Sequence, residues 1–318
     1  MAITNTTIAG LAGSERKLEV RVNAIRDESN ELVQSGLTAS SEEIQTLANG
    51  GPRKVSLDYV KPLSADVFNV TNDDINTEGD VGHMEGGSFN AHRVDVNYAW
   101  GTTDLTQIVT QYGRQGDLAS GIAGYQNAVT KGLLTSALKG VKAALASNAL
   151  ITKEVATDWD MSVVYDMTAT AEEWATGFTG MMVSHGRYAK LQAKNDGFVA
   201  PSDVNTRFGQ YQGFNLLKSN TLSDDEVVVF RNGALGYGEG TAQVAFEVDR
   251  LKRAAGGGGA DILISRFSRA IHPLGMSYEG GIAKSQAEVK AFLEALASWE
   301  LVAPEAQFGF RFIKFNDA

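Results

Sequence analysis

Hydrophobic and polar residues change their spacing several times along the chain, which predicts a mixture of helical and extended regions. Residues 14–34 carry apolar side chains close to helical spacing, with charged residues on the other faces, and this pattern predicts an amphipathic arm. The arm is either a solvated surface helix or a segment that packs on a neighbouring subunit. A short helix is expected from Ser40, because Ser40 and Glu43 have capping-box spacing and residues 49–52 (NGGP) supply a stop.

From Val55 to Trp100 the pattern changes to the alternation of extended strands, around a tip rich in glycine. These residues predict a long two-stranded hairpin. Between Asp66 and Asp95 the hairpin holds seven acidic residues and one arginine, Arg93, so its surface should be strongly negative. Since an isolated two-stranded ribbon is only marginally stable in water, we expect something else to cover it.

A long helix is expected after Asp117, a candidate N-cap, because an apolar stripe continues from there to Asn148. At a rise of about 1.5 Å per residue it would be a rod on the order of 45 Å long. Gly124, Gly132 and Gly140 lie inside it. Each costs about 1 kcal/mol relative to alanine, so either tertiary packing compensates or the helix breaks near Thr130.

The rest of the chain alternates strands and helices. Thr170 and Glu173 have the spacing of another capping box, and an apolar run from Met181 to Val183 precedes a helical segment at residues 185–194. The remaining expected elements are a buried strand at 227–230, two alternating strands near 244–248 and 262–264 joined as a hairpin by Gly256–Gly259, a helix at 286–299, and a closing strand through Phe308, Phe310 and Phe312. Together these elements predict an α+β fold.

Composition narrows the function classes. The 318 residues have an ordinary globular composition, with 43% hydrophobic and 21% charged residues. A net charge of -10, from 38 acidic and 28 basic residues, gives no overall basic surface of the kind that reads DNA sequence. The absence of cysteine excludes disulfides, thiolate nucleophiles and cysteine-bound zinc. We expect no membrane partner, because the sequence shows neither a secretory signal pattern nor an apolar span of about 20 residues.

An acidic stretch in the predicted hairpin approaches the calcium-loop pattern. Its members are Asp74, Asn76, Glu78, Gly79 and Glu85, with glutamate at the fifth position in place of Asp or Asn. A calcium loop of this kind needs a helix on each side, whereas the flanks at Val67–Val70 and Val94–Val96 are strand-like. A solvated hairpin tip is therefore favoured over a calcium site.

Two histidines in the same region suggest a metal site. His83 and His92 have Asp80 and Asp95 nearby, but the pair lacks the helical spacing that commonly brings two histidines to one ion. We expect both to be surface histidines.

Two short motifs suggest catalysis or phosphate binding, but their context does not support either. Ser184 lies beside His185, yet no Gly-x-Ser-x-Gly elbow surrounds the pair and adjacency in sequence is not the geometry of a triad. Gly236, Gly238 and Gly240 lack the spacing of a dinucleotide loop and precede a strand, so they are expected to be turn glycines between strands. We therefore expect no catalytic, cofactor-binding or metal-binding residues.

Residues 225–280 resemble the major capsid proteins of tailed bacteriophages in the order of their features. That order is an apolar strand at 227–230, the run Gly233-Ala234-Leu235-Gly236, the pair Glu239-Gly240, a charged strand end at Glu247, Asp249 and Arg250, a glycine turn, a strand at 262–266, and Ile271-His272-Pro273-Leu274-Gly275. Met276 stands where the family usually has an aromatic residue, and Tyr278 follows two positions later. Residues 181–191 and 297–300 look like the family's strand-to-helix step and C-terminal helix. We assign His272-Pro273 a structural role at a strand-to-turn junction, since proline fixes φ and removes a backbone donor.

This resemblance implies the HK97-type capsid fold, an α+β architecture with four parts. Residues 1–54 would be an N-terminal arm, and residues 55–105 an extended β-hairpin, the E-loop. Residues 106–155 would be a peripheral domain (P-domain) with a long spine helix. Residues 156–318 would be a mixed α/β axial domain, with a peripheral-domain hairpin returning near 241–280.

The same resemblance implies a structural protein rather than an enzyme. Subunits would form pentamers and hexamers and close them, in the cytoplasm of the bacterial host, into the icosahedral head of a virion. Further partners would be portal, scaffolding or decoration proteins, and packaged double-stranded DNA contacted without reading its sequence. The alternative is an encapsulin-like cellular compartment shell, which shares the fold; a soluble hydrolase or a calcium-binding module is the second alternative.

Lysines on the predicted long helix have the opposite charge to the acidic hairpin. Lys139 and Lys142 are two of them. We hypothesise that these lysines contact the hairpin of a neighbouring subunit, because opposite charges favour such a contact.

Overall fold

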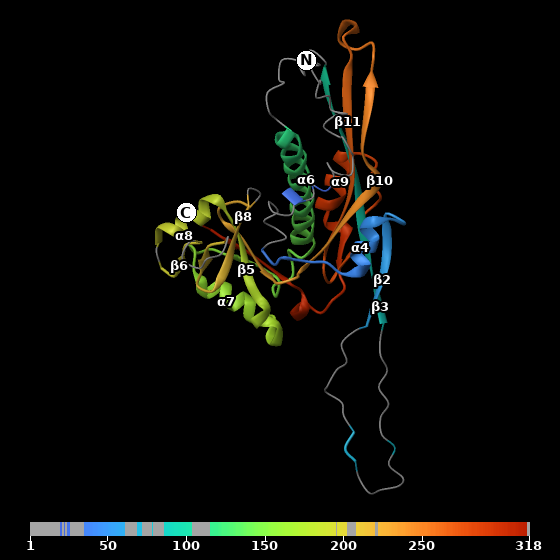
Figure 1. Ribbon diagram of the computed structural model, residues 1–318. Coiled ribbons are helices and arrows are strands. Elements are labelled where there is room, and N and C mark those ends of the chain that lie inside the picture. Colours follow the sequence, from blue (N-terminus) through green and yellow to red (C-terminus); the bar gives the residue numbers. More distant parts are fainter. Residues whose placement is uncertain are drawn as a thin grey trace.

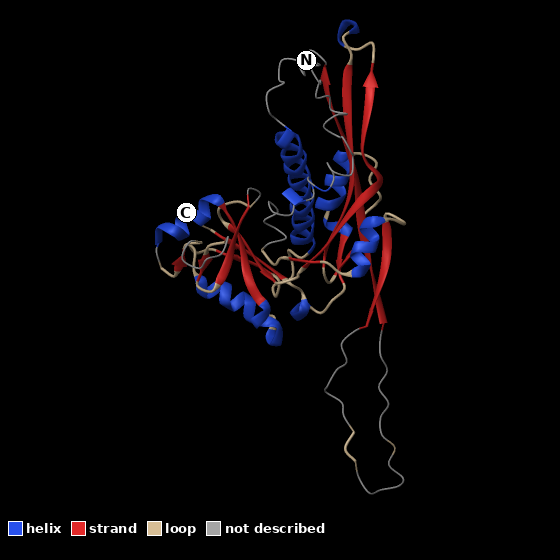
Figure 2. Ribbon diagram, in the orientation of Figure 1, coloured by secondary structure: helices blue, strands red, loops and turns tan. Residues whose placement is uncertain are grey.

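The computed structural model describes residues 20, 22, 24, 25, 35–60, 69–71, 78, 86–103, 115–194, 196–201, 208–219 and 222–316. Two β-sheets organise these residues: an elongated sheet of five strands and a compact sheet of seven (Figure 1). Helix α6 (Gln115–Ala144) runs between them, and further helices and loops pack around both sheets (Figure 2). The fold is therefore of the mixed α and β kind that the sequence predicts.

The five-stranded sheet has the order β1-β10-β11-β3-β2. Its strands are β1 (Thr38–Ala39), β2 (Lys54–Val60), β3 (Gly86–Thr103), β10 (Leu235–Leu251) and β11 (Ala260–Pro273). β2 pairs antiparallel with the first half of β3, which confirms a two-stranded hairpin at its base, although most of residues 61–85 lie outside the described residues. The second half of β3 pairs with β11, so this strand is supported on a wider sheet. The predicted β10–β11 hairpin is also confirmed.

The seven-stranded sheet has the order β4-β14-β9-β5-β8-β7-β6. Its strands are β4 (Thr152–Val155), β5 (Phe178–Ser184), β6 (Phe198–Val199), β7 (Gln210–Tyr211), β8 (Phe214–Ser219), β9 (Glu226–Arg231) and β14 (Phe310–Phe315). A separate pair joins β12 (Met276–Tyr278) to β13 (Trp299–Leu301). The predicted strands at 181–183 and 227–230 are β5 and β9, and the closing strand is β14, although Phe308 precedes it.

Alternation along β9 explains why both faces of the seven-stranded sheet are buried. Val228 and Phe230 point to the core shared with α6, whereas Val227 and Val229 point to the opposite face. Helices α7 (Met161–Ala169) and α8 (His185–Lys194) supply the residues that cover that opposite face. We call the sheet together with α7 and α8 the compact lobe.

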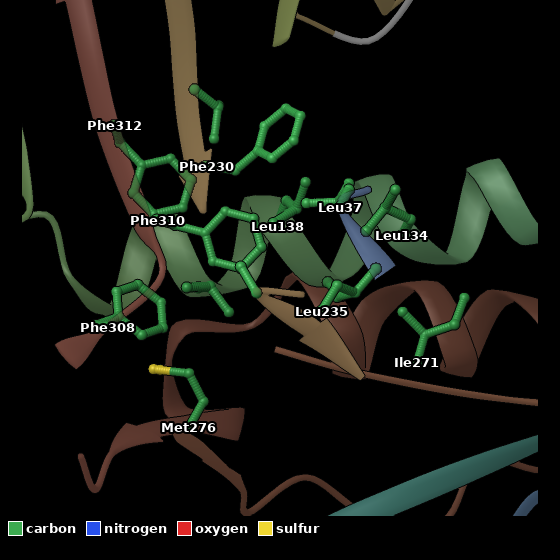
Figure 3. Packing of buried hydrophobic residues seen from close by; sticks show 14 of the residues in the cluster. Leu37, Leu134, Leu138, Phe230, Leu235, Ile271, Met276, Phe308, Phe310 and Phe312 are labelled. Carbon is green, nitrogen blue, oxygen red and sulfur yellow. The ribbon is translucent and has the colours of Figure 1, made fainter. Parts of the chain in front are cut away.

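The core shared with α6 joins the compact lobe to the five-stranded sheet. In Figure 3, Phe310 of β14 lies close to Leu138 of α6, with Leu235 of β10 beside them. Phe308, Phe310 and Phe312 are at most 1% exposed. Aromatic burial on this scale is among the largest contributions that single side chains make to folding.

Five α-helices within the described residues have defined ends, and their boundaries correct several predictions. They are α4 (Glu42–Asn49), α6, α7, α8 and α9 (Gln286–Glu294); short 3-10 helices span Glu172–Gly177, Ala255–Gly257, Leu296–Ser298 and Glu305–Gln307. α8 has the predicted bounds, whereas α7 was not predicted. None of the helices in the described part of the chain has the length and hydropathy to cross a bilayer.

The predicted caps of the long helix and of α4 are displaced. α6 begins at Gln115, so Asp117 lies inside the helix rather than at its N-cap. The helix ends at Ala144, and Asn148 instead closes a turn by accepting a hydrogen bond from the Leu150 N–H at 3.0 Å. Ser41, not Ser40, caps α4, because its hydroxyl accepts from the Ile44 N–H at 3.2 Å.

Two further helix ends also differ from prediction. Thr170 is the C-cap of α7, and its hydroxyl donates to the carbonyls of Leu150 and Met167, so it does not open a helix with Glu173. α9 ends at Glu294 rather than continuing to Trp299, which begins β13 instead.

Tertiary packing at Gly140 is one reason why α6 remains continuous past Thr130. A Cβ atom at Gly140 would lie 2.0 Å from the Leu293 carbonyl oxygen and 2.6 Å from the Trp299 indole nitrogen. Glycine therefore lets α6 approach α9 and β13 closely. Of the two alternatives that the sequence left open for this helix, packing is the one observed.

Candidate assembly surface

The end of the five-stranded sheet where β10 turns into β11 extends away from the rest of the chain (Figure 1). We call this end the distal ribbon; it consists of residues 96–103 of β3, 241–251 of β10 and 260–267 of β11. β10 pairs with β1 only at Leu235 and Gly236, so no described strand covers the outer edge of its residues 241–251. The unpaired backbone groups of such an edge can pair with another chain.

The distal ribbon also exposes large apolar side chains. Tyr98, Val244 and Leu251 are 48%, 47% and 42% exposed. The Tyr98 ring lies 4.9 Å from Trp100 and 5.0 Å from Tyr125 of α6, measured between centroids. Together they form an aromatic surface on the side of the sheet that faces α6. Exposed apolar surface of this kind commonly marks an interaction site.

A residue from the N-terminal part of the chain covers part of the ribbon face that is turned toward α6. Val22 is fully buried and belongs to the same cluster as Ile122 of α6, Phe246 of β10 and Leu263 of β11. Apart from residues 20, 22, 24 and 25, the predicted amphipathic arm at 14–34 lies outside the described residues. The contact still shows that a segment distant in sequence is needed to bury this part of the ribbon.

Five aromatic and imidazole rings meet where the five-stranded sheet joins β12 and β13, and we call this cluster the histidine junction. Its members are Phe89 and His92 of β3, His272 of β11, Tyr278 of β12 and Trp299 of β13. The centroid distances are 5.1 Å from Phe89 to His272, 4.3 Å from His92 to Tyr278 and 5.2 Å from Tyr278 to Trp299. His92 is only 7% exposed, so the prediction that it lies at the surface is wrong.

Burial controls the protonation of both histidines. It lowers the pKa of His92 from 6.5 to about 4, opposed by the nearby Asp95 carboxylate and assisted by Lys54. It likewise lowers the pKa of His272 to about 4, and the neighbouring His92 adds to the effect. Both rings are therefore neutral at pH 7. The prediction that His272-Pro273 ends a strand is confirmed, since β11 ends at Pro273.

The predicted metal candidates do not come together in the described residues. Asp95 forms ion pairs with Arg53 and Arg93, each at 2.8 Å. Asp80 and His83, like all the calcium-loop candidates except Glu78, lie outside the described residues. Where the structure describes the chain, no group of three or more acidic, histidine or cysteine side chains could hold a metal ion.

The Ser184-His185 pair has a structural explanation. The Ser184 hydroxyl accepts from the Arg187 N–H at 2.9 Å, which caps α8, and donates to the Asp224 carboxylate. His185 is exposed on the first turn of the helix. The serine therefore anchors the start of α8 to the loop before β9.

The glycines expected in a turn between strands lie within β10, so that prediction is wrong. Cβ atoms at Gly236, Gly238 and Gly240 would meet α4: the nearest atoms are Ile44 Cδ1 at 2.2 Å, the Ile44 carbonyl oxygen at 2.5 Å and the Ala48 carbonyl oxygen at 1.9 Å. Because alternate strand residues face the same side, three glycines at this spacing make a flat seat for α4. The signal in the sequence was the period of two, which is typical of a strand rather than of a turn.

Both lysines of the charge hypothesis have acidic partners within the chain. Lys142 forms an ion pair with Glu226, and the Lys139 amine lies 3.9 Å from the Glu294 carboxylate. The long helix therefore uses these charges to hold β9 and α9, and an external partner is not needed to explain them.

Comparison with known proteins shows what the fold resembles. The sequence matches no family model and no curated protein. Among solved structures, a chain of Microbacterium phage Oxtober96 matches at a TM-score of 0.50 and 10% identity, over 87% of this chain and 92% of that one. The capsid of Ralstonia phage GP4 matches at 0.54 and 11%, over 76% and 84%. A chain of Mycobacterium phage Cain matches at 0.51 and 11%, over 91% and 92%.

These likenesses extend over most of each chain, while the sequences have almost nothing in common. At such identities the likeness is one of fold. It agrees with the resemblance that residues 225–280 carry in their sequence. The chain therefore has the fold of the phage capsid proteins.

Proposed function

We propose that this chain is the major capsid protein of a tailed bacteriophage, a structural subunit that assembles with copies of itself into the icosahedral head around the genome. The observation that carries the proposal is the distal ribbon, which combines a strand edge that no described strand covers with exposed apolar side chains. Such a surface is a liability for a monomer and an advantage for a subunit whose neighbours bury it. The fold shared with phage capsid proteins supports the same conclusion.

The parts expected from the HK97 architecture follow as proposals. α6 would be the spine helix, and β2 with β3 would form the base of the E-loop at 55–105. Residues 1–54 would be the N-terminal arm. The P-domain would combine residues 106–155 with the β10–β11 hairpin near 241–280, and the axial domain would occupy the rest of 156–318. In support, β3 and β11 pair along eleven registered positions, from Arg93 to Thr103.

The partners of the assembled protein are also proposals. Copies would form pentamers and hexamers in the cytoplasm of the bacterial host, together with portal, scaffolding or decoration proteins. Packaged DNA would be contacted without reading its sequence. Because the net charge of the chain is -10, local groups of basic residues would have to make these contacts. No enzymatic role is proposed, since Ser184, His92 and His272 have the structural contacts described above.

The first test is the oligomeric state of the purified protein. Size-exclusion chromatography with negative-stain electron microscopy should show capsomer-sized rings and closed polyhedral shells. A chain that stays a small soluble monomer under all assembly conditions would contradict the proposal. Shells isolated from the natural source that protect DNA from nuclease would support a virion, and shells that hold protein cargo without DNA would favour the compartment alternative.

A further inference from the structure

Strand β3 changes its pairing partner at a single point. Its residues 86–92 pair with β2, whereas residues 93–103 pair with β11, and no described residue of β3 belongs to both ladders. We call β2 together with residues 86–92 the hairpin base. Because the two ladders meet end to end, the hairpin base can turn relative to the distal ribbon without breaking a hydrogen bond between β3 and β11.

Arg93 fixes the point where the two ladders meet. Its backbone N–H donates to the Arg53 carbonyl at 2.8 Å. Its guanidinium donates to the carbonyls of Leu47 and Gly51, at 3.1 and 3.2 Å, which lie in the last turn of α4 and just after this helix. The same guanidinium forms an ion pair with Asp95 at 2.8 Å. Contacts with α4 and with both neighbouring parts of the sheet therefore hold Arg93 as a fixed pivot.

Apolar packing of the hairpin base lies close to this pivot. The cluster that joins the base to α4 contains Val55, Leu57 and Ala91. Val55 and Ala91 are a registered pair beside the pivot, and Leu57 lies two residues further along β2. Beyond Leu57, the next registered pair, Asp58 and Ser88, is exposed on both strands. Packing on α4 therefore holds the pivot end of the base and not its far end.

One carboxylate joins the hairpin base to β12. Glu279, the residue after β12, accepts hydrogen bonds from the Ser277 hydroxyl at 2.6 Å and from the Asn90 side-chain amide at 2.8 Å. It also forms an ion pair with Lys54 of β2 at 3.3 Å. The hydrogen bonds from Ser277 and Asn90, assisted by the charge of Lys54, lower the pKa of Glu279, so the carboxylate is charged at neutral pH. We call these four residues the Glu279 clasp.

The clasp is made of side chains that water can reach. Among the described strands, β3 and β12 share no backbone ladder, and the Glu279 side chain is 41% exposed. Exposed ion pairs contribute little, because water and salt compete with them. The stacked rings beside the clasp, His92 on Tyr278 and Phe89 on His272, add a modest attraction. The hairpin base is therefore held on β12 more weakly than residues 93–103 are held on β11.

We propose that the hairpin base is a hinged unit. The Glu279 clasp holds it against β12, and release of the clasp lets the base swing about Arg93 as one body while the ladder between β3 and β11 stays closed. This inference goes beyond the proposed function, because it describes a movement within a single chain and does not require assembly. Since solvent reaches Glu279, cations that compete with Lys54 for its carboxylate would favour release.

Distances between spin labels in the purified chain test the swing. Because the chain has no cysteine, Ser88→Cys with Lys290→Cys places one label on the hairpin base and one on α9. Asn97→Cys with Lys290→Cys places the first label on β3 beyond the pivot instead. All three side chains are exposed. When Glu279→Gln is added, the ratio of swung to clasped molecules should rise by about fivefold for the first pair, and the distances of the second pair should not change.

A matched control and two further conditions sharpen the test. Glu300→Gln makes the same change of charge at an exposed position of β13, beside the clasp, and should leave both label pairs unchanged. Asn90→Asp sets a second carboxylate against Glu279 and should release the base more than Glu279→Gln does. Raising the ionic strength to about 1 M should shift the unmodified clasp in the same direction, a measurement that needs no change to the clasp residues.

Hydrogen exchange followed by mass spectrometry distinguishes a swing from local melting. A base that swings as one body keeps its own backbone pairs, so peptides covering residues 54–60 and 86–92 should stay protected in Glu279→Gln. Faster exchange throughout both peptides would mean that the base melts, and this result would overturn the proposal. Equal changes in the two label pairs, or no change in either under any of the three conditions, would overturn it as well.

Failure of the hinge and failure of the proposed function can be told apart. The label distances and hydrogen exchange are measured on the single chain. A chain that forms no capsomers or shells but shows the swing contradicts only the proposed function. A chain that forms shells but keeps the first label pair fixed contradicts only the hinge.

Discussion

The compact lobe and the distal ribbon are built from similar apolar strands but differ in what covers them. In the lobe, four successive residues of β9, Val227–Phe230, are at most 2% exposed, because α6 covers one face of the sheet and α7 and α8 cover the other. In the ribbon, Tyr98 and Val244 remain about half exposed. The lobe is therefore covered on both faces, as in a domain that is stable alone. The ribbon leaves apolar side chains exposed, as is typical of a surface that contacts another chain.

Helix α6 connects the two environments and shows the same difference along its length. Near its start, Ile122 and Tyr125 contact the ribbon, where the cluster of buried residues is small. Toward its end, Leu134 and Leu138 belong to the largest cluster of buried residues in the described part of the chain. Stability should therefore be unequal along one continuous helix, and substitutions in the two regions should separate folding from assembly.

The largest expected effect of a single substitution is in the core beside the compact lobe. Phe230→Ala should lower the free energy of unfolding by about 3–5 kcal/mol, because the ring is fully buried and its loss leaves a cavity. Urea unfolding of the unassembled chain, followed by circular dichroism, measures this. Val244→Ala in the ribbon should change the same quantity by less than about 0.5 kcal/mol. Equal losses for the two variants would show that the ribbon is as much a part of the folding core as the lobe.

Acidification should lower the free energy of unfolding through the histidine junction, whose residues belong to neither the compact lobe nor the distal ribbon. The folded chain holds His92 and His272 at a pKa of about 4, against 6.5 for an ordinary histidine, so the unfolded chain binds more protons between those values. Stability should fall as the pH drops from 6.5 to 4, by ~3 kcal/mol for each histidine. The double variant His92→Phe with His272→Phe should show a shallower fall, measured as the free energy of unfolding against pH. An unchanged slope would mean that other groups control acid sensitivity.

A matched pair of glycines in α6 sharpens the comparison further. Gly140→Ala should destabilise by about 1–3 kcal/mol, because its Cβ would lie 2.0 Å from the Leu293 carbonyl oxygen in the packed half of the helix. Gly124→Ala should stabilise by about 1 kcal/mol, because the helix gains alanine's propensity and a Cβ there meets no atom within 4 Å among the described residues. Denaturant midpoints of the two variants give both values. A loss at Gly124 would show that something fills the open half of α6.

The sequence predicted strands and helices well where periodicity is local. The span of α8 and the pairing of β10 with β11 follow from apolar spacing and from the glycine turn, both visible within a few residues. Ends that depend on distant contacts were missed. α9 ends at Glu294 instead of continuing to Trp299, because Trp299 pairs with Tyr278 in a separate two-stranded sheet, a contact that no local pattern contains.

Exposure was harder to predict than extended structure. His92 is buried against the ring of Tyr278, which lies far away in the sequence. α4 packs closely on β10 over glycines that were predicted to form a turn. The Glu279 clasp stood out by no motif, since the side chains that meet at its carboxylate come from three separate strands. Periodicity identifies which residues share a face, but the neighbour that covers that face is set by tertiary structure, or by another subunit.

The smallest effect on folding, and the sharpest on assembly, is expected at the ribbon. Val244→Ser should leave the free energy of unfolding within about 0.5 kcal/mol of the unmodified chain, because the side chain is already 47% exposed. If a neighbouring copy buries that side chain, the concentration needed for half-maximal assembly should rise by about five- to tenfold. Leu150→Ser, 45% exposed at the edge of the compact lobe, is the matched control, and light scattering during assembly measures both. Equal weakening by the two variants would show that exposed apolar surface is used throughout the subunit. Weakening by Val244→Ser alone would locate the contact in the ribbon, where no described strand covers the outer edge of β10.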